Sequence, residues 1–369
     1  MYDAIVIGAR CAGSPTAMLL ARKGYNVLLA DKSTFPSDIM STHYIHLPGV
    51  ARLQNWGLLD RVWAAGTPRI EQVTVYLDGV PFTPPRFDAD LAACCPRRTV
   101  LDKILVDAAV EAGVELREGF SVRELVFDDG AVAGISGSQG GATVTEKARI
   151  VIGADGLHSL VARHVKPAEY DAVPSLTFAY YAYFSGVPAE GAELRPLDEG
   201  GILVFPTNDG LTCVAAGGPA EGFHNFRADI EGNFFKLLDK VPDLAERVRA
   251  GKREERFVGT NDQPNYFRRP YGPGWALVGD AGYHRDFITG LGITDAFRDA
   301  ELLTEAIDAG FSGRRSLDEA MAGYESVRNR FAKPLYDVTL SMARGVAGAD
   351  IFMQFGIAMQ AMMPVPVEA

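Results

Sequence analysis

The stretch DAIVIGARCAG, residues 3–13, decides the fold of this chain. It begins as an apolar strand and ends in a glycine-containing turn, after which residues 14–24 have the pattern of a helix and residues 25–31 return to a strand. This order predicts half of a dinucleotide-binding βαβ unit, whose backbone amides and helix N-terminus receive a pyrophosphate. Asp31 follows Gly8 by 23 residues and can accept a hydrogen bond from an adenosine ribose.

Arg10 stands where the G-x-G-x-x-G pattern has its middle glycine. Its side chain would crowd a closely approaching phosphate unless the guanidinium turns toward the phosphate as a charged donor. We expect the side chain to swing away from the phosphate or to pair with the cofactor, so that Arg10→Gly retains the cofactor. An ordinary βαβ unit without a nucleotide is the alternative at this point.

The composition is that of a globular protein with a large core: 369 residues, 47% hydrophobic and 22% charged. Such a length predicts two domains or one elaborated domain. Lys and Arg number 36 and Asp and Glu 47, so the net charge of −11 makes nucleic acid an unsuitable partner. The four cysteines are too few and too irregularly spaced for a disulfide framework or a zinc ribbon, so we expect no metal and a reducing, cytoplasmic location.

Neither end of the sequence has the pattern of a membrane segment. The first strand begins almost at Met1, without the basic and apolar segments of a signal peptide. The apolar stretch 351–367 is interrupted by glutamines and prolines and is too short to span a bilayer. We therefore expect this stretch to pack on the protein, with no stable membrane insertion.

A polar loop over residues 32–49 follows the first βαβ unit and could fold back over a cofactor. Its His43 is a candidate site residue, although a solvated loop histidine is the favoured interpretation. Further along, Asp78-Gly79 predicts a hairpin between strands 70–77 and 80–83. Helices are expected over 50–56, 100–112, 229–238 and 244–250, and strands over 114–116, 121–128, 131–136 and 142–146.

A second chemical signal is the apolar strand 148–152 with the abrupt turn Gly153-Ala154-Asp155-Gly156. This turn places a carboxylate at the carboxyl end of a buried parallel strand, where ligands bind in open α/β sheets. The chain changes character over residues 172–257, where β-prone runs at 178–184, 201–205 and 211–216 suggest an antiparallel sheet.

Aromatic side chains alternate along the first of these runs. Phe178, Tyr180 and Phe184 belong to one face, and Tyr181 and Tyr183 to the other. Either face can line a pocket for a flat apolar ligand, and core packing explains the same residues equally well.

The third and sharpest signal lies at residues 274–292. The buried strand 274–278 ends in Gly279-Asp280, whose carboxylate can bind a polyol hydroxyl, and Gly290-Leu291-Gly292 precedes a long helix over 293–309. The positive end of that helix points at whatever occupies the preceding loop. Residues 317–347 are helical in pattern, and Pro334 is expected to end or kink this helix.

Together the three motifs resemble the FAD-dependent monooxygenase superfamily of the para-hydroxybenzoate hydroxylase fold, related to geranylgeranyl reductases and flavin-dependent halogenases. The likeness spans almost the entire chain and implies a mixed α/β (α+β) fold. It implies a Rossmann-like FAD-binding domain from residues 1–70, 97–168 and 269–320, with an inserted antiparallel-sheet substrate domain from 71–96 and 169–268. Residues 321–369 would form a C-terminal helical segment.

The resemblance also implies which residues contact FAD. Arg98, in Arg98-x-x-Leu101-Asp102, matches the arginine that precedes the family's FAD-contacting helix. The loop from Asp286 to Gly292 would face the isoalloxazine, with Phe287 where the family usually has proline. The implied FAD-binding residues are Gly8, Arg10, Ala12, Gly13, Asp31, Lys32, Arg98, Asp155, Gly279, Asp280, Gly290, Leu291 and Gly292.

The implied activity is insertion of one oxygen atom from O2 into an aromatic or polycyclic apolar small molecule, through a flavin C4a-hydroperoxide. No second Gly-rich βαβ unit follows, so NAD(P)H would bind transiently as electron donor or a partner flavin reductase would supply the electrons. His43, His284, Tyr181 and Tyr183 are candidates for substrate orientation or proton transfer.

Two other activities stay open from the sequence. Residues 201–206 lack both tryptophans of the halogenase motif W-x-W-x-I-P, which disfavours halogenation. Phe205-Pro206 matches the end of the corresponding reductase motif, so a reductase or dehydrogenase of unsaturated bonds is the main alternative. A flavin-binding protein without turnover is the third.

Overall fold

The computed structural model describes residues 1–77, 79–83, 91–346 and 348–364. A mostly parallel sheet with its covering helices forms one half of the structure, called the first half below, and a second sheet forms the other half. The mostly parallel sheet has the strand order β19-β20-β10-β1-β2-β7, and only the β19–β20 pair is antiparallel within this path. The strands are β1 (Tyr2–Ile7), β2 (Val27–Ala30), β7 (Glu115–Arg117), β10 (Ala142–Gly153), β19 (Tyr271–Gly272) and β20 (Trp275–Leu277). Strands β8 (Ser121–Asp128) and β9 (Ala131–Gln139) continue it as an antiparallel meander on β10.

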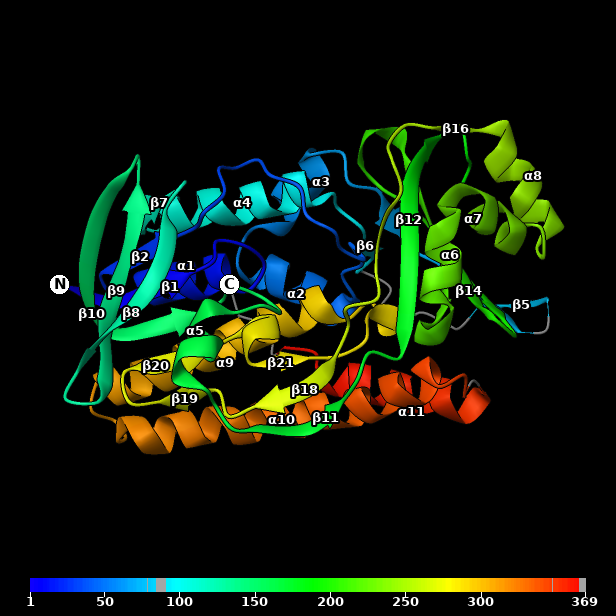
Figure 1. Cartoon of the computed structure of the whole chain (residues 1–369). Helices are drawn as coiled ribbons and strands as arrows, with labels where there is room; N and C mark the ends of the chain where they lie inside the picture. Colours follow the sequence, from blue (N-terminus) through cyan, green and yellow to red (C-terminus); the bar gives the residue numbers. More distant parts are fainter. Residues whose placement is uncertain (78, 84–90, 347, 365–369) are drawn as a thin grey trace.

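Helices cover one face of this sheet because their apolar stripes pack on β1, β2 and β10 (Figure 1). The other face buries apolar side chains from β8, β9 and α5 (Leu160–Val165). The covering helices are α1 (Gly13–Arg22), α2 (Leu47–Asn55), α3 (Leu59–Ala64), α4 (Arg98–Glu111), α9 (Gly292–Phe311) and part of α10 (Leu317–Ala343).

A second sheet has the order β16-β12-β15-β14-β13-β4-β5, with β17 also pairing with β12. All pairs are antiparallel except β4 with β13. Its strands are β4 (Val73–Leu77), β5 (Val80–Phe82), β12 (Thr177–Ser185), β13 (Ala192–Leu197), β14 (Gly200–Pro206), β15 (Thr212–Pro219), β16 (Lys252–Arg253) and β17 (Val258–Thr260).

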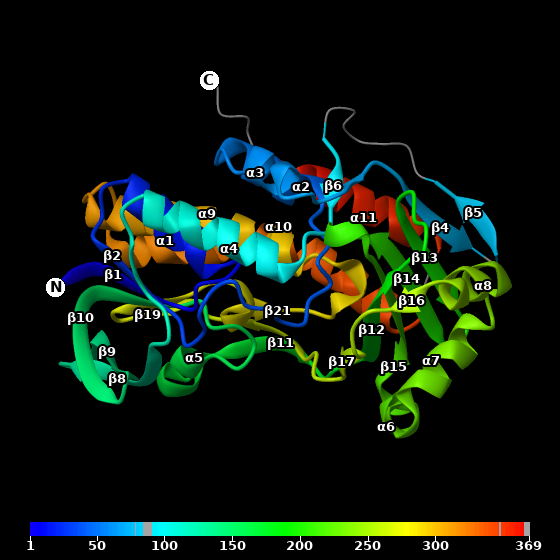
Figure 2. The same ribbon diagram turned by 90° about the horizontal axis from the view of Figure 1, so that it is seen from above.

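The two faces of the second sheet have different neighbours, as the alternation along β12 predicts. Phe184 packs with helices on one side of the sheet, whereas Tyr181 and Tyr183 pack on the other side with Tyr44 and Ile70. The helices lie on the outer side of this sheet, away from the parallel sheet (Figure 2). The outer helices are α6 (Phe223–Ala228), α7 (Ile230–Leu238) and α8 (Pro242–Ala250). The predicted assignment of these aromatic residues to opposite faces is therefore confirmed.

Short elements connect the two halves. A three-stranded sheet contains β11 (Glu169–Val173), β18 (Asn265–Arg268) and β21 (Tyr283–His284), and a small ribbon pairs β3 (Arg69–Ile70) with β6 (Ala93–Cys94). Short 3₁₀ turns occur at η1 (Asn208–Gly210), η2 (Ala220–Gly222), η3 (Gly279–Ala281) and η4 (Phe287–Thr289). The proposed domain boundaries stay a prediction.

The C-terminal region corrects one expectation and confirms another. Helix α10 continues through Pro334 to Ala343, so of the two predicted effects of this proline the end of the helix is wrong, and the kink stays a prediction. Helix α11 (Ala349–Ala361) packs on the protein, as expected, through a cluster that includes Leu335 and Met359. Asp78 of the predicted hairpin turn and residues 365–367 of the C-terminal stretch lie outside the described residues.

The mixed α/β class expected from the sequence is confirmed. No helix in the described part of the chain is long and apolar enough to cross a membrane.

Candidate functional site

The turn between β1 and α1 is built around two close backbone approaches. Gly8 has φ +103°, and a Cβ added there would overlap the carbonyl oxygen of Ala154, which follows β10. A Cβ added at Gly13 would overlap the carbonyl oxygen of Gly8. These glycines therefore allow the turn to fold tightly against β10 and the start of α1, with Ala12 as the N-cap residue.

The start of α1 carries a polar group without a protein partner. The hydroxyl of Ser14 is buried and has no hydrogen-bond partner among the described residues. Buried polar groups are almost always hydrogen-bonded in folded proteins. An anionic ligand at the helix N-terminus would accept a hydrogen bond from this hydroxyl and benefit from the helix dipole.

Asp31, directly after β2, is hydrogen-bonded to the same turn. Its carboxylate accepts hydrogen bonds from the backbone N–H groups of Ala9 and Ser33, both at 2.7 Å. A carboxylate has about four lone-pair positions, so these two bonds leave capacity for a ribose hydroxyl. Lys32, the next residue, is exposed.

Arg10 turns toward α4. Its Nη1 lies 2.6 Å from Asp102 Oδ2, and its Nη2 donates to Ser37 Oγ at 3.0 Å. Asp102 is 0% exposed and also accepts hydrogen bonds from Arg98 at 2.9–3.1 Å. Whether Arg10 swings away from the phosphate or pairs with the cofactor stays a prediction.

Asp280 lies in η3, directly after β20. Gly279 has φ +62°, and an added Cβ would lie 2.8 Å from the Cβ of Ala12, so the end of β20 approaches the start of α1 closely. The carboxylate of Asp280 accepts no hydrogen bond from any described residue. Burial raises its pKa, while the positive charge of Arg98 and the neighbouring His284 oppose that rise.

Asp155 lies at the carboxyl end of β10 and contacts the start of α5. Its Oδ2 accepts a hydrogen bond from the Leu160 N–H at 2.6 Å, whereas its Oδ1 is buried without a partner in the described residues. Burial raises its pKa, against the hydrogen bonds that favour the carboxylate. The turn over residues 153–156 therefore supplies one acceptor that the described residues leave unpaired, Asp155 Oδ1, beside the turn that contains Gly8.

The loop before α9 is fixed to the second sheet. The Asp286 carboxylate accepts hydrogen bonds from the Thr177 hydroxyl at 2.7 and 2.9 Å and from the Ile288 N–H at 3.0 Å. Gly290 has φ +63° and approaches Tyr44. Gly292 is exposed at the start of α9, whereas the Leu291 side chain is buried against Leu335, Met359 and Met362, so Leu291 offers a ligand its backbone rather than its side chain.

His43 is buried, and the expectation of a solvated loop histidine is wrong. It is 0% exposed, with φ +59°, and its Nε2 lies 2.5 Å from the hydroxyl of Tyr183. Burial, with the nearby charges of Arg98 and Arg97, lowers the pKa of His43 to about 3. The imidazole is therefore neutral at physiological pH. The sequence missed this burial because the partners come from β12 and α4.

Tyr181 lies beside this pair. Its hydroxyl accepts a hydrogen bond from the Ser41 N–H at 3.3 Å, and its ring centroid lies 5.6 Å from that of Tyr183. Burial raises the pKa of Tyr181 to about 12. His284, by contrast, contacts the carbonyl oxygen of Pro264 through Nδ1 and lies near Asp280, so it belongs to a different part of the site from His43.

Sequence reasoning missed Arg97, which directly precedes α4. Its guanidinium lies 3.8 Å from the centroid of the Tyr183 ring and forms ion pairs with Glu255 at 2.8 Å and Asp38 at 3.3 Å. Because these partners come from three separated segments, only the folded chain identifies the contact. Arg97 thus places a cation against the aromatic face of β12.

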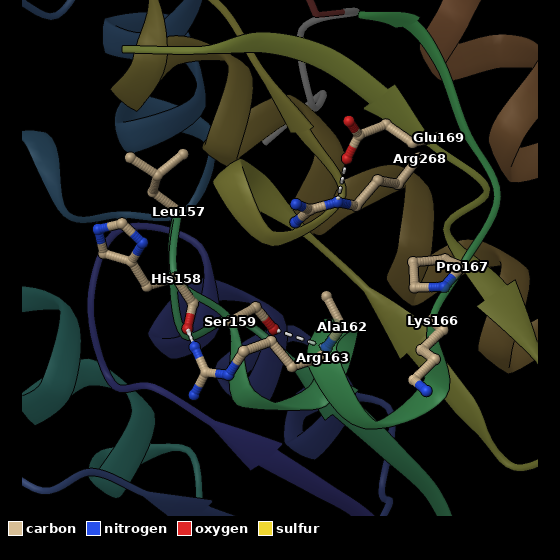
Figure 3. Close-up of a pocket in the computed structure, with 9 residues that line it drawn as sticks. All are labelled: Leu157, His158, Ser159, Ala162, Arg163, Lys166, Pro167, Glu169 and Arg268. Carbon is tan, nitrogen blue, oxygen red and sulfur yellow. Dashed lines mark hydrogen bonds and ion pairs between the residues drawn. The ribbon is translucent and has the colours of Figure 1, made fainter. Parts of the chain in front are cut away.

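A pocket of about 310 Å³ lies beside α5 (Figure 3). Arg268 lines it and pairs with Glu169 at 3.1 Å, while a second nitrogen of Arg268 donates to the carbonyl oxygen of Ala281, next to Asp280. The basic side chains of Arg163, Lys166 and Arg268 line this pocket. The full lining consists of Leu157, His158, Ser159, Ala162, Arg163, Lys166, Pro167, Glu169 and Arg268. None of the predicted site residues is among them.

Comparison with known proteins identifies the class. Residues 1–180 match the family model described as an FAD binding domain. The chain is 26% identical to digeranylgeranylglycerophospholipid reductase of Methanocella arvoryzae, over 90% of this chain and 84% of the reductase. It is also 26% identical to kynurenine 3-monooxygenase of Salinispora tropica, over 91% of this chain and 78% of that enzyme.

Solved structures share the fold. PqsL of Pseudomonas aeruginosa, in complex with 2-aminobenzoylacetate, superposes with a TM-score of 0.82 at 22% identity, covering 96% of this chain and 99% of PqsL. The myxobacterial chondrochloren halogenase CndH gives a TM-score of 0.84 at 21% identity, covering 98% and 89%. The chain is similar to the FAD-dependent monooxygenase superfamily of the para-hydroxybenzoate hydroxylase fold, related to geranylgeranyl reductases and flavin-dependent halogenases.

The protein is thus a flavoprotein oxidoreductase with FAD as its cofactor. The residues present fit this group. The Ser14 hydroxyl and Asp155 Oδ1 are buried polar atoms without a partner in the described residues, at the start of α1 and the end of β10. Within the described residues, no group of three or more His, Cys, Asp or Glu side chains is arranged to hold a metal ion.

Proposed function

We propose that this protein is a monooxygenase that inserts one oxygen atom from O2 into an aromatic or polycyclic, largely apolar small molecule, with NAD(P)H as electron donor. FAD would supply the redox chemistry, since two electrons from the donor allow one oxygen atom to enter the substrate and the other to leave as water. The protein's own residues would orient the substrate and exclude water.

The inner face of the second sheet is the observation that carries this proposal. Tyr181, Tyr183 and Phe205 form a buried, mainly apolar surface with Tyr44, on the side of the sheet that packs against the first half. Its polar groups are few and placed at defined points, as in sites for small aromatic ligands. The hydrogen bond between Thr177 and Asp286 ties this sheet to the loop before α9.

Within this surface, we assign the His43–Tyr183 pair to substrate orientation and proton transfer. The neutral imidazole can accept the proton of the Tyr183 hydroxyl at Nε2, and that hydroxyl oxygen can in turn accept a hydrogen bond from a substrate. Arg97, against the same ring, favours negative charge developing on the Tyr183 oxygen or on a neighbouring substrate oxygen. Tyr181 supplies a second hydroxyl on this surface, and we assign His284 a polar contact in the different part of the site near Asp280.

The proposed FAD ligands are those implied by the motifs. The turn from Gly8 to Gly13 and the hydroxyl of Ser14 would receive the pyrophosphate, Asp31 the adenosine ribose and Asp280 the ribitol. The loop that ends at Gly292 would lie against the isoalloxazine. Asp155 and Arg98 would support the pyrophosphate region, and Lys32 would lie near the adenosine end.

For the electron donor, we favour direct binding of NAD(P)H over a partner flavin reductase. The pocket beside α5 brings Arg163, Lys166 and Arg268 around one hollow, a charge pattern that suits the phosphates of a nicotinamide nucleotide. Lys166→Ala should raise the KM for NAD(P)H without changing FAD affinity. Oxygen consumption that requires an added reductase would favour the partner instead.

The test is to purify the protein, record its visible spectrum, and follow NAD(P)H and O2 consumption with candidate phenols and polycyclic compounds. A yellow protein whose NAD(P)H and O2 consumption rise together with substrate supports the proposal. A colourless protein that FAD cannot reconstitute would remove it. Bound FAD that no donor reduces would point instead to a flavin-binding protein without turnover.

A reductase of unsaturated bonds is the second candidate. The similarity to digeranylgeranylglycerophospholipid reductases over 90% of this chain favours it, as does the match at Phe205-Pro206. Such an enzyme would reduce its substrate without O2. Product formation under strictly anaerobic conditions therefore distinguishes the two candidates.

A further inference from the structure

Arg10 connects three segments that surround the start of α1. The residue itself belongs to the turn after β1, its Nη1 pairs with Asp102 of α4 at 2.6 Å, and the same guanidinium contacts both the hydroxyl and the carbonyl oxygen of Ser37 at 3.0 and 3.3 Å. The guanidinium also lies 5.3 Å from the centroid of the Phe35 ring. A glycine, which the usual pattern has at this position, makes none of these contacts.

Ser37 is near the middle of the loop between β2 and α2, which runs from the adenosine end of the site toward the second sheet (Figures 1 and 2). At its start, the Ser33 N–H donates to Asp31. At its far end, Ser41 and His43 contact Tyr181 and Tyr183 of β12. Arg10 is therefore attached to this loop between its two ends.

Asp102, the partner of Arg10 on α4, is itself held by several hydrogen bonds. Asp102 is fully buried and accepts hydrogen bonds from both Arg98 and Arg10, and the Cys11 thiol donates to it at 3.4 Å. Hydrogen bonds between charged groups are about twice as strong as those between neutral groups. Arg10 is also only 18% exposed in its side chain, so water screens the pair weakly.

We propose that Arg10 is a latch that closes the loop between β2 and α2 over bound FAD and slows cofactor release. FAD in this site would lie between the turn that carries Arg10 and the loop that carries Ser37, so its release requires these segments to separate. Separation breaks the contacts of Arg10 with Ser37. The latch acts whether the enzyme is a monooxygenase or a reductase, and it goes beyond both proposals.

The experiment measures the rate at which FAD leaves the holoenzyme, from the rise in flavin fluorescence after dilution. Arg10→Gly should release FAD about tenfold faster, the loss expected for one charge-assisted contact, and should still bind FAD at saturating concentration. Arg10→Lys keeps the positive charge beside Asp102 but cannot bridge Asp102 and Ser37 together, so it should behave like Arg10→Gly.

Ser37→Ala tests the latch with the arginine in place and should speed release in the same direction by a smaller factor. Arg61→Ala is the matched control, because Arg61 pairs with Glu111 at the far end of α4 and should leave the release rate unchanged. If Arg10→Lys and Ser37→Ala both release FAD at the wild-type rate, the arginine acts by charge alone and the latch is excluded. Failure of folded Arg10→Gly protein to bind any FAD would also overturn it, by making Arg10 a principal ligand.

Discussion

The turn after β1 and the inner face of the second sheet serve the same site but are constructed differently. Around the turn, backbone segments approach so closely that Gly8 and Gly13 have no room for a side chain, and the Ser14 hydroxyl and Asp155 Oδ1 are buried without a partner in the described residues. On the sheet, His43 and Tyr183 bond to each other and fill the surface with aromatic rings. The cofactor region is thus shaped by backbone contacts, whereas the substrate region is shaped by side-chain contacts, among which His43 Nδ1 and Arg97 Nε are buried without a partner in the described residues.

This difference has a chemical reason. FAD offers fixed groups, a pyrophosphate and two sugars, which backbone amides and single carboxylates at strand ends can bind. A substrate is specific to one enzyme, so its surface is formed by side chains from separate segments. Changes on the cofactor side should therefore affect FAD binding and the fold, and changes on the sheet should affect turnover.

The largest effect is expected at Gly13. In Gly13→Ala the new Cβ overlaps the Gly8 carbonyl oxygen, so the turn and α1 must move apart. We expect a loss of about 3 kcal/mol in the free energy of unfolding together with loss of FAD, measured by denaturant unfolding and flavin absorbance. Gly323→Ala in α10 is the control, because an added Cβ there meets nothing closer than 4.0 Å and should stabilise the helix by up to about 1 kcal/mol. A fully stable, FAD-loaded Gly13→Ala protein would contradict the preformed turn.

Asp280→Ala should weaken FAD binding by about tenfold to a hundredfold, since it removes a charged acceptor for a ribitol hydroxyl. Titration of apoprotein with FAD, followed by flavin fluorescence, gives the dissociation constant. Asp308→Ala is the matched control, because Asp308 lies near the C-terminal end of α9, where its carboxylate accepts hydrogen bonds from Tyr25 and Lys23. Equal affinities in the two variants would show that Asp280 is not a ligand.

Tyr183→Phe should leave FAD affinity unchanged and lower turnover, because it removes the hydroxyl that bonds to His43. The imidazole Nε2 would be left buried without a partner, which costs about 1 to 2 kcal/mol of stability. Tyr181→Phe removes a hydroxyl that accepts a long, 3.3 Å hydrogen bond from the Ser41 N–H, so it should reduce stability and turnover less. Steady-state turnover and thermal unfolding of both variants measure the difference between the two tyrosines. A larger loss of turnover in Tyr181→Phe than in Tyr183→Phe would contradict the role assigned to the His43–Tyr183 pair.

The last prediction concerns the pH dependence of stability. His43 has a pKa of about 3 in the folded protein and an ordinary value of 6.5, so between these values the unfolded chain binds a proton that the folded protein does not. This contribution to stability is fully present above pH 6.5 and is lost as the pH falls toward 3. His43→Gln should reduce the slope of unfolding free energy against pH by about one proton near pH 5. An unchanged slope would mean that His43 is accessible to protons in the folded state.

The same contrast explains what the sequence could predict. The strand-turn-helix units around Gly8, Asp155 and Asp280 were predictable, because each is a local pattern of apolar strand, glycine turn and carboxylate. The partners of Arg10 were not, since Ser37 and Asp102 are 27 and 92 residues away. The burial of His43 depends on β12, 140 residues away, so local polarity suggested a solvated loop instead.

Pro334 shows a second limit of prediction from sequence, which concerns local helix propensity. Proline disfavours a helix interior because it lacks an N–H group and its ring crowds the preceding turn. Helix α10 nevertheless continues through it, with Leu335 and Tyr336 both buried in apolar clusters immediately afterward. Tertiary packing on both sides of the proline, which a local propensity does not include, stabilises the continuous helix.

Turnover under labelled oxygen tests the proposed function most directly. FAD-loaded protein would be supplied with NAD(P)H and a panel of phenolic and polycyclic compounds under ¹⁸O2, and the products examined by mass spectrometry. We predict a product that carries one ¹⁸O atom and does not form without O2. A product that gains two hydrogen atoms, contains no ¹⁸O and forms equally well under anaerobic conditions would contradict it and identify a reductase.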